Sequence, residues 1–548
     1  MTIRMDNKYS DLHRTIESVA LARRSSGAVI VASESTGRRE SWLFDFRALM
    51  LQPYWLNRYA EIFWERYAPK YPFQVGAMET AAIALVAAIV MKGIERGTPV
   101  NGFYIRKSRK RQGLMRQIEG TLDEHPVILV DDLINTGSTF EKQLAVLADT
   151  GRKVTDVFAM LAFRARDAYK SLEDRSIAVN HLFTLEDFGI PLLKKVQPNK
   201  NSEFETVWRY TGPHPSLHLV VQKSAPVLDD TLVFLGCDDG TMRALDQRTG
   251  AIIWEFTVGK HPEGKGILST PALHKGVLYF GAYDGVVYAL DTKTGVKKWG
   301  YDDADWVGSS PSIAPDLGLL YIGLEFGLFG KRGGIVALDM HTGEKRWQDI
   351  TSSLTHGTPL YIKEEGMVVI GSNDGICYAY EANTGALMWR YKTDGDIKTA
   401  PAYDAKRRLV FVASMDGKLY ALAADTGEPV FAYETGGAIY SIPLVQGDTV
   451  YVASLDKSVY AIDIDTKKRR WAFETNGRVF GSPIAIGDSL FIGSNDGRLY
   501  ELDRERGTHR GHFQASERMM SKIACNETTK HLFARTVANE MYCLKRKS

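Results

Sequence analysis

The chain has 548 residues, which is too long for one ordinary domain, and its 44% hydrophobic and 24% charged residues are typical of a globular protein. Its formal net charge of +2 argues against a dedicated nucleic-acid binder, because residues 106–116 form the one prominent basic run. The four cysteines form no CxxC motif and no adjacent pair, which argues against a zinc site and a disulfide framework.

Strands and helices alternate up to about residue 200. Apolar runs typical of strands lie at 26–33, 127–130 and 154–161. Amphipathic or Ala-rich stretches typical of helices lie at 54–68, 81–94 and 140–150. This order predicts an α/β domain over residues 1–202, with a mostly parallel sheet covered by helices.

The segment VILVDDLINTGST, residues 127–139, is the most informative of these. Four apolar β-formers lead into Asp131 and Asp132, and a loop of small polar residues then opens a helix at Phe140. Backbone N–H groups in such a loop bind phosphate, and adjacent acids suit ribose hydroxyls or a metal. The Gly-Lys-Ser/Thr ending of a P-loop is absent, and a strand–turn–helix without a ligand is the alternative interpretation.

The same segment resembles the 5-phosphoribosyl-1-pyrophosphate (PRPP) motif of the type I phosphoribosyltransferases, in which an apolar run and two acids precede Thr-Gly-x-Thr. Further stretches resemble the orotate phosphoribosyltransferases in the order of that family, namely 35–47, 76–85, 104–120, 161–166 and 181–188. The resemblance implies an enzyme that uses PRPP and Mg²⁺ to transfer ribose-5-phosphate to a base or related acceptor, releasing pyrophosphate.

The resemblance also implies which residues bind PRPP. Asp131 and Asp132 would hold the ribose hydroxyls and organise Mg²⁺ through water, so we expect no direct protein ligand to the metal. The other PRPP-binding residues would be Asn135, Thr136, Gly137, Ser138 and Thr139 at the 5′-phosphate, and Glu79 and Thr80 at the pyrophosphate.

Residues 104–120 resemble the mobile catalytic loop of the family. Arg106, Lys107 and Lys110 would neutralise the departing pyrophosphate there, and the two aspartates would complete the catalytic set. A solvated basic loop or a nucleic-acid patch is the alternative for this run. Arg164 would contact the acceptor base, and its alternative is an ordinary surface arginine at a strand end.

Four residues depart from the family pattern. Gln112 stands in place of the loop histidine and Ser35 in place of a lysine, while Ala81 and Ala82 stand in place of paired glycines. A proton donor, a cation near the base and close backbone approach are lost at these positions. They leave the acceptor open, and they motivate a second hypothesis: a weakly catalytic or non-catalytic sensor of PRPP or a nucleotide.

A repeat replaces this pattern after about residue 203. One slot recurs every 40 to 48 residues and holds Trp208, Trp254, Trp299, Trp347, Trp389, Phe431, Trp471 and His512. Asp-Gly and Thr-Gly pairs supply tight hairpin turns between the strands. The period predicts an eight-bladed β-propeller over residues 203–548. The last blade lacks its outer strand, so we expect residues 204–211 to pair with 540–546 and close the ring.

The repeated unit Ala-Leu-Asp-x-x-Thr-Gly-x-x-x-Trp, as at 289–299, resembles the propellers of pyrroloquinoline-quinone enzymes and of related outer-membrane assembly lipoproteins. The adjacent cysteine pair of the quinone enzymes is absent, so we expect no quinone cofactor. We expect instead a platform that binds a protein partner. Four residues occupy equivalent positions in their blades, each three residues before a proline: Lys223, His356, Lys398 and Tyr440. We expect them to line one end of the central channel, and ordinary polar residues of the rim are the alternative interpretation.

Partners and location follow from the same observations. The resemblance implies a homodimer through the first domain. No apolar signal core opens the sequence, and no apolar run is long enough to span a bilayer. We therefore expect a cytoplasmic protein with no membrane partner and no nucleic-acid partner.

Overall fold

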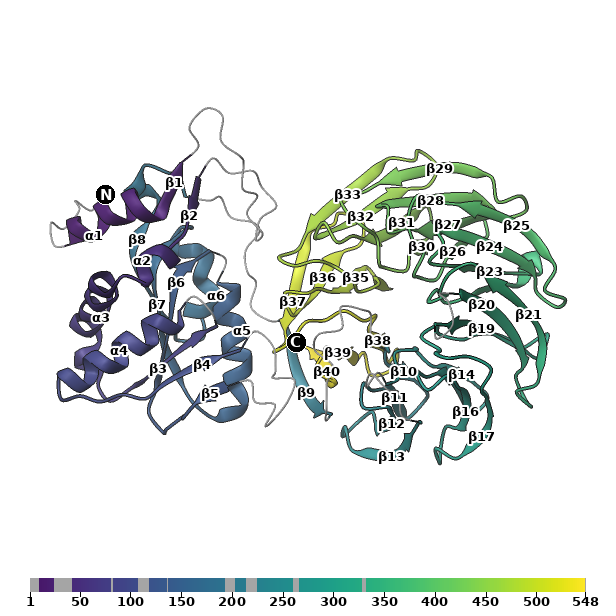
Figure 1. Cartoon of the computed structure of the whole chain (residues 1–548), viewed down its shortest axis with the longest axis horizontal. Coiled ribbons are helices and arrows are strands. Elements are labelled where there is room, and N and C mark those ends of the chain that lie inside the picture. The colour runs from purple at the N-terminus through teal and green to yellow at the C-terminus, as the bar shows by residue number, and fades with distance from the viewer. Residues whose placement is uncertain are drawn as a thin grey trace. The chain divides into compact units, whose positions relative to one another are not determined.

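The computed structural model divides into two compact units, Met1–Asn201 and Ser202–Ser548 (Figure 1). It describes residues 9–23, 42–79, 82–106, 118–135, 137–192, 203–212, 224–259, 266–327 and 332–547. Outside these ranges lie the strand expected at 26–33 and the residues Ser35, Thr80, Ala81, Lys107, Lys110, Gln112, Thr136 and Lys223.

The first unit is built on a six-stranded sheet with the order β5-β4-β3-β6-β7-β8. Its strands are β3 (Gln74–Met78), β4 (Gly102–Ile105), β5 (Ile118–Gly120), β6 (Val127–Ile134), β7 (Val154–Ala162) and β8 (Ala178–Thr184). All neighbouring pairs are parallel except β4 with β5. The expected α/β domain with a mostly parallel sheet is therefore confirmed.

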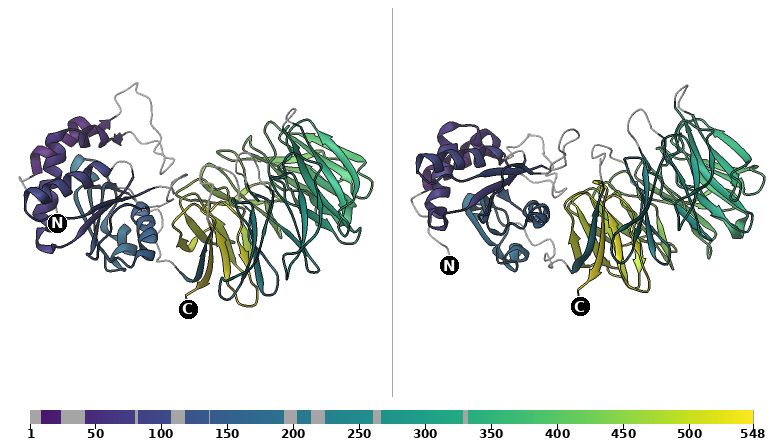
Figure 2. Two further views of the ribbon diagram at one scale, coloured as in Figure 1. Left: turned by 60° about the horizontal axis from the view of Figure 1, so that its bottom comes forward. Right: turned by 90° about the horizontal axis from the view of Figure 1, so that it is seen from below.

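Helices cover both faces of this sheet (Figure 2). The main helices are α3 (Pro53–Tyr67), α4 (Ile83–Glu95) and α5 (Ser138–Leu147), and the short ones are α1 (Ser10–Thr15), α2 (Arg47–Met50) and α6 (Lys170–Glu173). Side chains of β6 alternate between two cores: Ile128 packs in the core that holds Trp64 of α3, and Leu129 packs in the core that holds Phe140 of α5. A small hairpin pairs β1 (Leu21–Arg23) with β2 (Trp42–Phe44).

Strand β6 is longer than the apolar run at 127–130 predicts. It continues to Ile134 because Asp131, Leu133 and Ile134 remain paired with the buried strand β7. The acid pair therefore lies inside the carboxyl-terminal half of the strand and not beyond its tip. The helix that follows begins at Ser138, two residues before the expected start.

The second unit is a ring of eight four-stranded antiparallel sheets, as the repeat predicts (Figure 1). Blades 1 to 4 are β10 (Val227–Leu228), β11 (Leu232–Gly236), β12 (Thr241–Asp246), β13 (Ile252–Thr257); β14 (Ala272–His274), β15 (Val277–Gly281), β16 (Val287–Asp291), β17 (Lys297–Tyr301); β18 (Ser312–Ala314), β19 (Leu319–Phe326), β20 (Arg332–Asp339), β21 (Lys345–Thr351); and β22 (Leu360–Ile362), β23 (Met367–Gly371), β24 (Ile376–Glu381), β25 (Leu387–Lys392).

Blades 5 to 7 continue the same pattern, and the eighth closes the ring. They are β26 (Ala402–Asp404), β27 (Leu409–Ala413), β28 (Lys418–Ala423), β29 (Pro429–Glu434); β30 (Leu444–Gln446), β31 (Thr449–Ala453), β32 (Ser458–Asp463), β33 (Arg469–Glu474); β34 (Ile484–Ile486), β35 (Ser489–Gly493), β36 (Arg498–Asp503), β37 (His509–Gln514); and β38 (Ala524–Cys525), β39 (Leu532–Arg535), β40 (Glu540–Arg546).

Strand β9 (Phe204–Thr211) supplies the missing outer strand of blade 8. It pairs antiparallel with β40, with Trp208 opposite Cys543. In Figure 1 the teal β9 lies beside the yellow β40 at the seam. The expected pairing of the two ends of the repeat region is confirmed. Within the described ranges, every helix is too short or too polar to cross a bilayer.

Candidate functional site

The candidate site of the first unit lies at the carboxyl ends of its parallel strands. The chain passes from β3 to β4 on one side and later returns to β6 on the other side of β3. The strand order therefore reverses between β3 and β6, and ligands of open α/β sheets bind outside the strand ends at such a reversal. Glu79 follows β3, and Asp131 and Asp132 lie on β6, so predicted PRPP-binding acids flank this point.

Asp131 and Asp132 are half-buried, and the local backbone holds their carboxylates. The N–H of Asp132 donates to Oδ1 of Asp131 at 2.9 Å, and the N–H of Leu133 donates to Oδ1 of Asp132 at 2.9 Å. Burial raises the pKa of the Asp132 carboxyl, and the negative charge of Asp45 adds to the rise. A ligand that brings hydroxyl donors or positive charge would stabilise the ionised form.

Asp45 and Arg47, which the sequence placed in the family-like stretch 35–47, form an exposed ion pair near the acid pair. The Arg47 guanidinium donates from Nε to Oδ1 of Asp45 at 2.8 Å and from Nη2 to Oδ2 at 3.0 Å. These hydrogen bonds lower the pKa of Asp45. The same hydrogen bonds are the main cause of the raised pKa of Arg47, and the negative charges of Asp45 and, last, Asp132 add to the rise, so the arginine also interacts electrostatically with the acid pair.

The start of α5, directly after Gly137, presents backbone N–H groups of the kind that bind anions. Gly137 adopts a left-handed conformation with φ of 80°, which favours glycine, and α5 begins directly after it. No side-chain cap is formed at this helix start among the described residues. Uncapped N–H groups at the start of a helix bind anions, and the helix dipole adds to the attraction. Thr139 is exposed on the first turn.

Tyr169 stabilises the end of β6 next to this helix start through two hydrogen bonds. Its hydroxyl donates to the carbonyl of Ile134 at 3.0 Å and accepts the backbone N–H of Arg164 at 3.2 Å. It therefore ties the end of β6 to the chain that leaves β7. Burial raises the pKa of Tyr169 to about 12, so the hydroxyl stays protonated and can donate. No motif in the chain singles out Tyr169, so the sequence did not predict its part in the site.

Arg164 lies beside Asn135, the first residue of the predicted phosphate-binding segment. Its side chain is 5% exposed, and Nε donates to Oδ1 of Asn135 at 2.9 Å. This bond orients the first residue of the loop. Contact between Arg164 and an acceptor base remains a prediction.

Arg106 and Glu79 meet at the carboxyl ends of β4 and β3. The N–H of Glu79 donates to the carbonyl of Ile105 at 2.9 Å. The Arg106 guanidinium lies 4.0 Å from a Glu79 carboxylate oxygen and 3.7 Å from a carboxylate oxygen of Glu119 on β5. The structure thus brings one predicted catalytic cation together with one predicted pyrophosphate residue.

The metal prediction is consistent with the donors present but is not tested by them. Among the described residues, no group of three or more His, Cys, Asp or Glu side chains is arranged to hold a metal ion. The acid pair supplies carboxylate oxygens, which suit Mg²⁺ through water.

In the second unit, three of the four predicted channel residues have described partners. His356 Nδ1 lies 3.0 Å from Oε1 of the buried Glu325, and Lys398 Nζ lies 3.0 Å from Oδ2 of Asp396. Burial raises the pKa of Tyr440 to about 12, with Glu325 and Asp396 adding to the rise. The three residues therefore belong to one region of mixed charge.

Comparison with known families identifies the second unit. The family model described as "Outer membrane protein assembly factor BamB" matches residues 205–361, 331–410 and 373–540, which together make more than half of the chain. BamB from Moraxella catarrhalis superposes with a TM-score of 0.51 at 20% identity, covering 63% of this chain and 98% of that one. A europium-containing methanol dehydrogenase superposes with a TM-score of 0.52 at 13% identity, covering 64% of this chain and 95% of that one.

The first unit is similar to a different group of proteins. The orotate phosphoribosyltransferase of Bradyrhizobium sp. (strain ORS 278) is 26% identical over 187 residues, which are 33% of this chain and 99% of the relative. The orotate phosphoribosyltransferase of Leptospira biflexa serovar Patoc (strain Patoc 1 / Ames) is 28% identical over 158 residues, which are 28% of this chain and 85% of the relative. The resemblance inferred from the motifs is thus confirmed for both parts of the chain.

Proposed function

The chain belongs, through residues 205–540, to the family described as outer membrane protein assembly factor BamB, and because its first unit is similar to orotate phosphoribosyltransferases, we propose that it transfers ribose-5-phosphate from PRPP. The acceptor is a base or a related nitrogen nucleophile, and the propeller is a platform that binds a partner. The acid pair of β6, followed by an uncapped helix start at the reversal of strand order, is the observation that carries this proposal.

The geometry suggests how PRPP would lie. The 5′-phosphate would accept the N–H groups at the start of α5, where Asn135 is oriented by Arg164. The ribose hydroxyls would donate to the carboxylates of Asp131 and Asp132. The pyrophosphate would extend toward Glu79 and Arg106, because these residues follow the neighbouring strands β3 and β4.

Transfer breaks the bond between C1 of the ribose and the pyrophosphate oxygen, and the acceptor nitrogen forms the new bond to C1. Positive charge develops on the sugar and negative charge on pyrophosphate. A bound Mg²⁺ would supply charge neutralisation to the pyrophosphate oxygens. Arg106 would supply a further positive charge after exchanging its glutamate partners for the leaving group.

A turnover assay tests the proposal. The full chain is incubated with isotopically labelled PRPP, Mg²⁺ and a panel of purine and pyrimidine bases. We expect labelled nucleotide with at least one base and loss of product in Asp131→Asn/Asp132→Asn. Glu124→Gln is the matched control, because Glu124 is an acid of the same unit whose exposed side chain pairs with Arg152. Turnover that is unchanged in the double variant would contradict the proposal.

A sensor of PRPP is the second candidate, and the pairing of Arg106 favours it. This cation is held between two glutamates, and the adjacent loop lacks the family histidine at Gln112. Tight PRPP binding measured by calorimetry, with no product from any base, is the result expected of a sensor. The homodimer through the first unit also remains a prediction, and sedimentation of the full chain measures it.

A further inference from the structure

Arg164 is the residue that the family resemblance assigns to the acceptor base, and its side chain is already engaged within the chain. The side chain is only 5% exposed, and Nε donates to Oδ1 of Asn135 at 2.9 Å. The backbone N–H of Arg164 donates to the hydroxyl of Tyr169 at 3.2 Å, which fixes the chain at this point. The sequence also has Ser35 where the family has a lysine near the base. A buried guanidinium with a partner in the chain has little surface left to pair with a charged acceptor.

Two further arginines of the site are held by carboxylates. Arg47 donates to both carboxylate oxygens of Asp45, at 2.8 and 3.0 Å. Arg106 lies 4.0 Å from a carboxylate oxygen of Glu79 and 3.7 Å from one of Glu119. Neither arrangement leaves an excess of positive charge for an acceptor.

Carboxylates outnumber these arginines once Asp131 and Asp132 are included. Burial raises the pKa of Asp132, and the negative charge of Asp45 adds to the rise, so the acids of this region already repel one another. A negatively charged acceptor would add to the repulsion. Residues 107–117 lie outside the described ranges, and the proposed function assigns the cations of this loop to pyrophosphate.

Partly buried aromatic rings lie beside the same strand ends. Phe163 directly follows β7, and its backbone N–H donates to the carbonyl of Ile134 at the end of β6, at 3.0 Å. Trp42, the first residue of β2, packs edge-on against Phe163 with the ring centres 5.5 Å apart. Both rings pack on the core of the first unit but are not fully covered by it. Their apolar surface suits an uncharged planar ring, whereas a carboxylate there would lose its water without gaining a cation.

The similar proteins are named orotate phosphoribosyltransferases, and orotate carries a carboxylate that is ionised at neutral pH. We propose that this chain instead transfers ribose-5-phosphate to an uncharged base, which packs against Trp42 and Phe163. A nitrogen of that base forms the bond to C1 as the bond from C1 to the pyrophosphate oxygen breaks, and the proton of that nitrogen is released to solvent. The preference depends on the proposed function, because only a transferase has an acceptor.

Two nucleotides that differ only in the carboxylate test the preference. Uridine 5′-monophosphate and orotidine 5′-monophosphate share the ribose, the 5′-phosphate and the pyrimidine ring. Calorimetric titration of the full chain measures the dissociation constant of each, and adenosine and guanosine 5′-monophosphate extend the comparison to uncharged purines. We expect orotidine 5′-monophosphate to bind at least about 10-fold more weakly than the tightest of the uncharged nucleotides, because its carboxylate finds no free counter-ion.

The Trp42→Arg variant locates the base. The new guanidinium gives the carboxylate a counter-ion, so the affinity for orotidine 5′-monophosphate relative to the uridine nucleotide should rise at least about 5-fold. Ile94→Arg is the matched control, because it adds the same charge at an exposed position in the last turn of α4. That helix connects β3 to the parallel strand β4, so its last turn lies at the amino ends of the strands, away from the site. Its affinity ratio should equal that of wild type.

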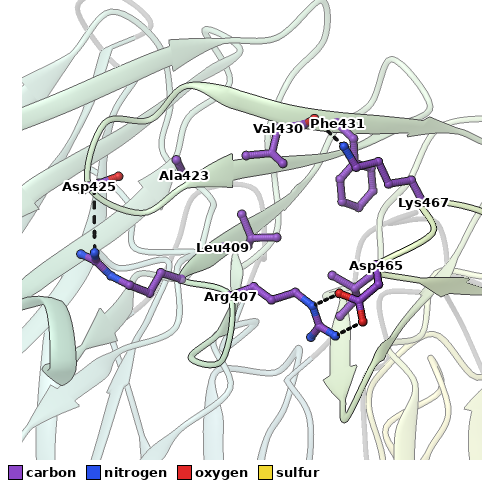
Figure 3. Close-up of a pocket in the computed structure, with 10 residues that line it drawn as sticks. Arg407, Leu409, Ala423, Asp425, Val430, Phe431, Asp465 and Lys467 are labelled. Carbon is purple, nitrogen blue, oxygen red and sulfur yellow. Dashed lines mark hydrogen bonds and ion pairs between the residues drawn. The ribbon is translucent and has the colours of Figure 1, made fainter.

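A cleft of about 450 Å³ in the propeller needs its own control, because its lining also carries cations. Figure 3 shows Arg407 paired with Asp465 there, and Lys467 beside Phe431. Phe431 and Lys467 stand in positions that a tryptophan and a glycine of the next blade occupy at six other junctions between blades. Lys467→Gln removes a cation from this cleft and should leave the affinity for every nucleotide unchanged.

The results separate the preference from the transferase proposal. If orotidine 5′-monophosphate binds more tightly than the uncharged nucleotides, or less than about 10-fold more weakly, the preference is overturned and the transferase stands. Binding of PRPP without binding of any nucleotide would overturn both and favour the sensor. Nucleotide binding that is lost in Lys467→Gln but kept in Asp131→Asn/Asp132→Asn would place the nucleotide in the propeller and overturn the preference. An unchanged ratio in a folded Trp42→Arg would overturn the placement of the base, and the wild-type comparison decides the preference even if that variant fails to fold.

Discussion

Asp132 illustrates how one side chain links stability to ligand binding. Burial raises its pKa, so the folded chain retains a proton at this carboxyl to higher pH than the unfolded chain does. The folded state binds more protons in that window, and stability therefore falls as pH rises through the raised pKa. The ionised carboxylate is the form that accepts ribose hydroxyls, so PRPP affinity should rise over the same window.

The Asp132→Asn variant separates these two effects. At neutral pH it should unfold at a higher temperature than wild type, because the cost of a buried charge is removed. It should also lose PRPP affinity and the pH dependence of that affinity. Thermal unfolding and calorimetry from pH 4 to pH 8 measure both quantities. A variant that is less stable than wild type at neutral pH would refute the burial argument.

The hydroxyl of Tyr169 is the second residue-scale test. Tyr169→Phe leaves the buried Arg164 N–H without its partner, which should cost about 1–3 kcal/mol of unfolding free energy, while the Ile134 carbonyl keeps the bond from the Phe163 N–H. It should also weaken PRPP binding, because the loop loses its brace. Tyr279→Phe is the control, since the Met340 carbonyl that its hydroxyl contacts keeps the bond from Trp299. Denaturant unfolding and PRPP titration of both variants check this, and unchanged PRPP affinity in Tyr169→Phe would contradict it.

The sequence predicted candidate site residues to the extent that they belong to a contiguous motif. Asp131, Asp132 and Gly137 were predicted because a strand, an acid pair and a small-residue loop stand together, and their binding of PRPP stays a prediction. Tyr169 was missed, and the Arg164–Asn135 bond was not foreseen, because these contacts join separate segments and depend on how β7 leaves the sheet. A sequence pattern does not show which separate segments of the chain come into contact in the fold.

Elements were predicted well where periodicity was strong and less well at their ends. Helices α3 and α4 and strand β7 lie within two residues of the expected bounds. Strand β6 runs further than its apolar residues, because pairing with β7 continues through the acids. Partner pairing, and not hydrophobicity, therefore sets where this strand ends.

The turn between β6 and α5 offers an element-scale test. Gly137→Ala places a side chain at φ of 80°, where the added methyl is strained even though the nearest neighbours are 3.7 Å away or more. We expect a loss of about 1 kcal/mol of unfolding free energy and a weaker PRPP complex. Gly151→Ala at φ of 68°, in the same unit but away from the loop, should lose similar stability and keep PRPP affinity. Equal PRPP affinity in the two variants would contradict the role of the turn.

At the scale of the whole molecule, the repeat predicted the number of blades and the closure of the ring. The period of the slot predicted eight blades, and the missing outer strand of the last blade pointed to β9. In blade 7 the prediction of His512 was wrong by one residue, because Gly511 takes the place opposite Glu501 that Trp471 takes opposite Ala461. The departure at Phe431 and Lys467 was not foreseen, because each looks like an ordinary substitution until the contacts of the tryptophans with the neighbouring blades are compared in space.

Closure by β9 makes Trp208 a sensitive position. Trp208→Ala removes the bond to the Gln247 carbonyl and the contact with Gly250 at the seam of the ring. We expect a loss of about 3 kcal/mol of unfolding free energy for the propeller. Phe431→Ala should cost less, because no hydrogen bond is lost there. Urea unfolding followed by tryptophan fluorescence compares them, and an equal or smaller loss in Trp208→Ala would argue against the seam.

The central claim is that the first unit holds PRPP through its acid pair and the start of α5. Calorimetric titration of the full chain with PRPP and Mg²⁺ tests it most directly. We predict saturable binding by wild type and by Glu124→Gln, and no measurable binding by Asp131→Asn/Asp132→Asn. Absence of binding by the wild-type chain, or equal binding by the double variant, would contradict the claim.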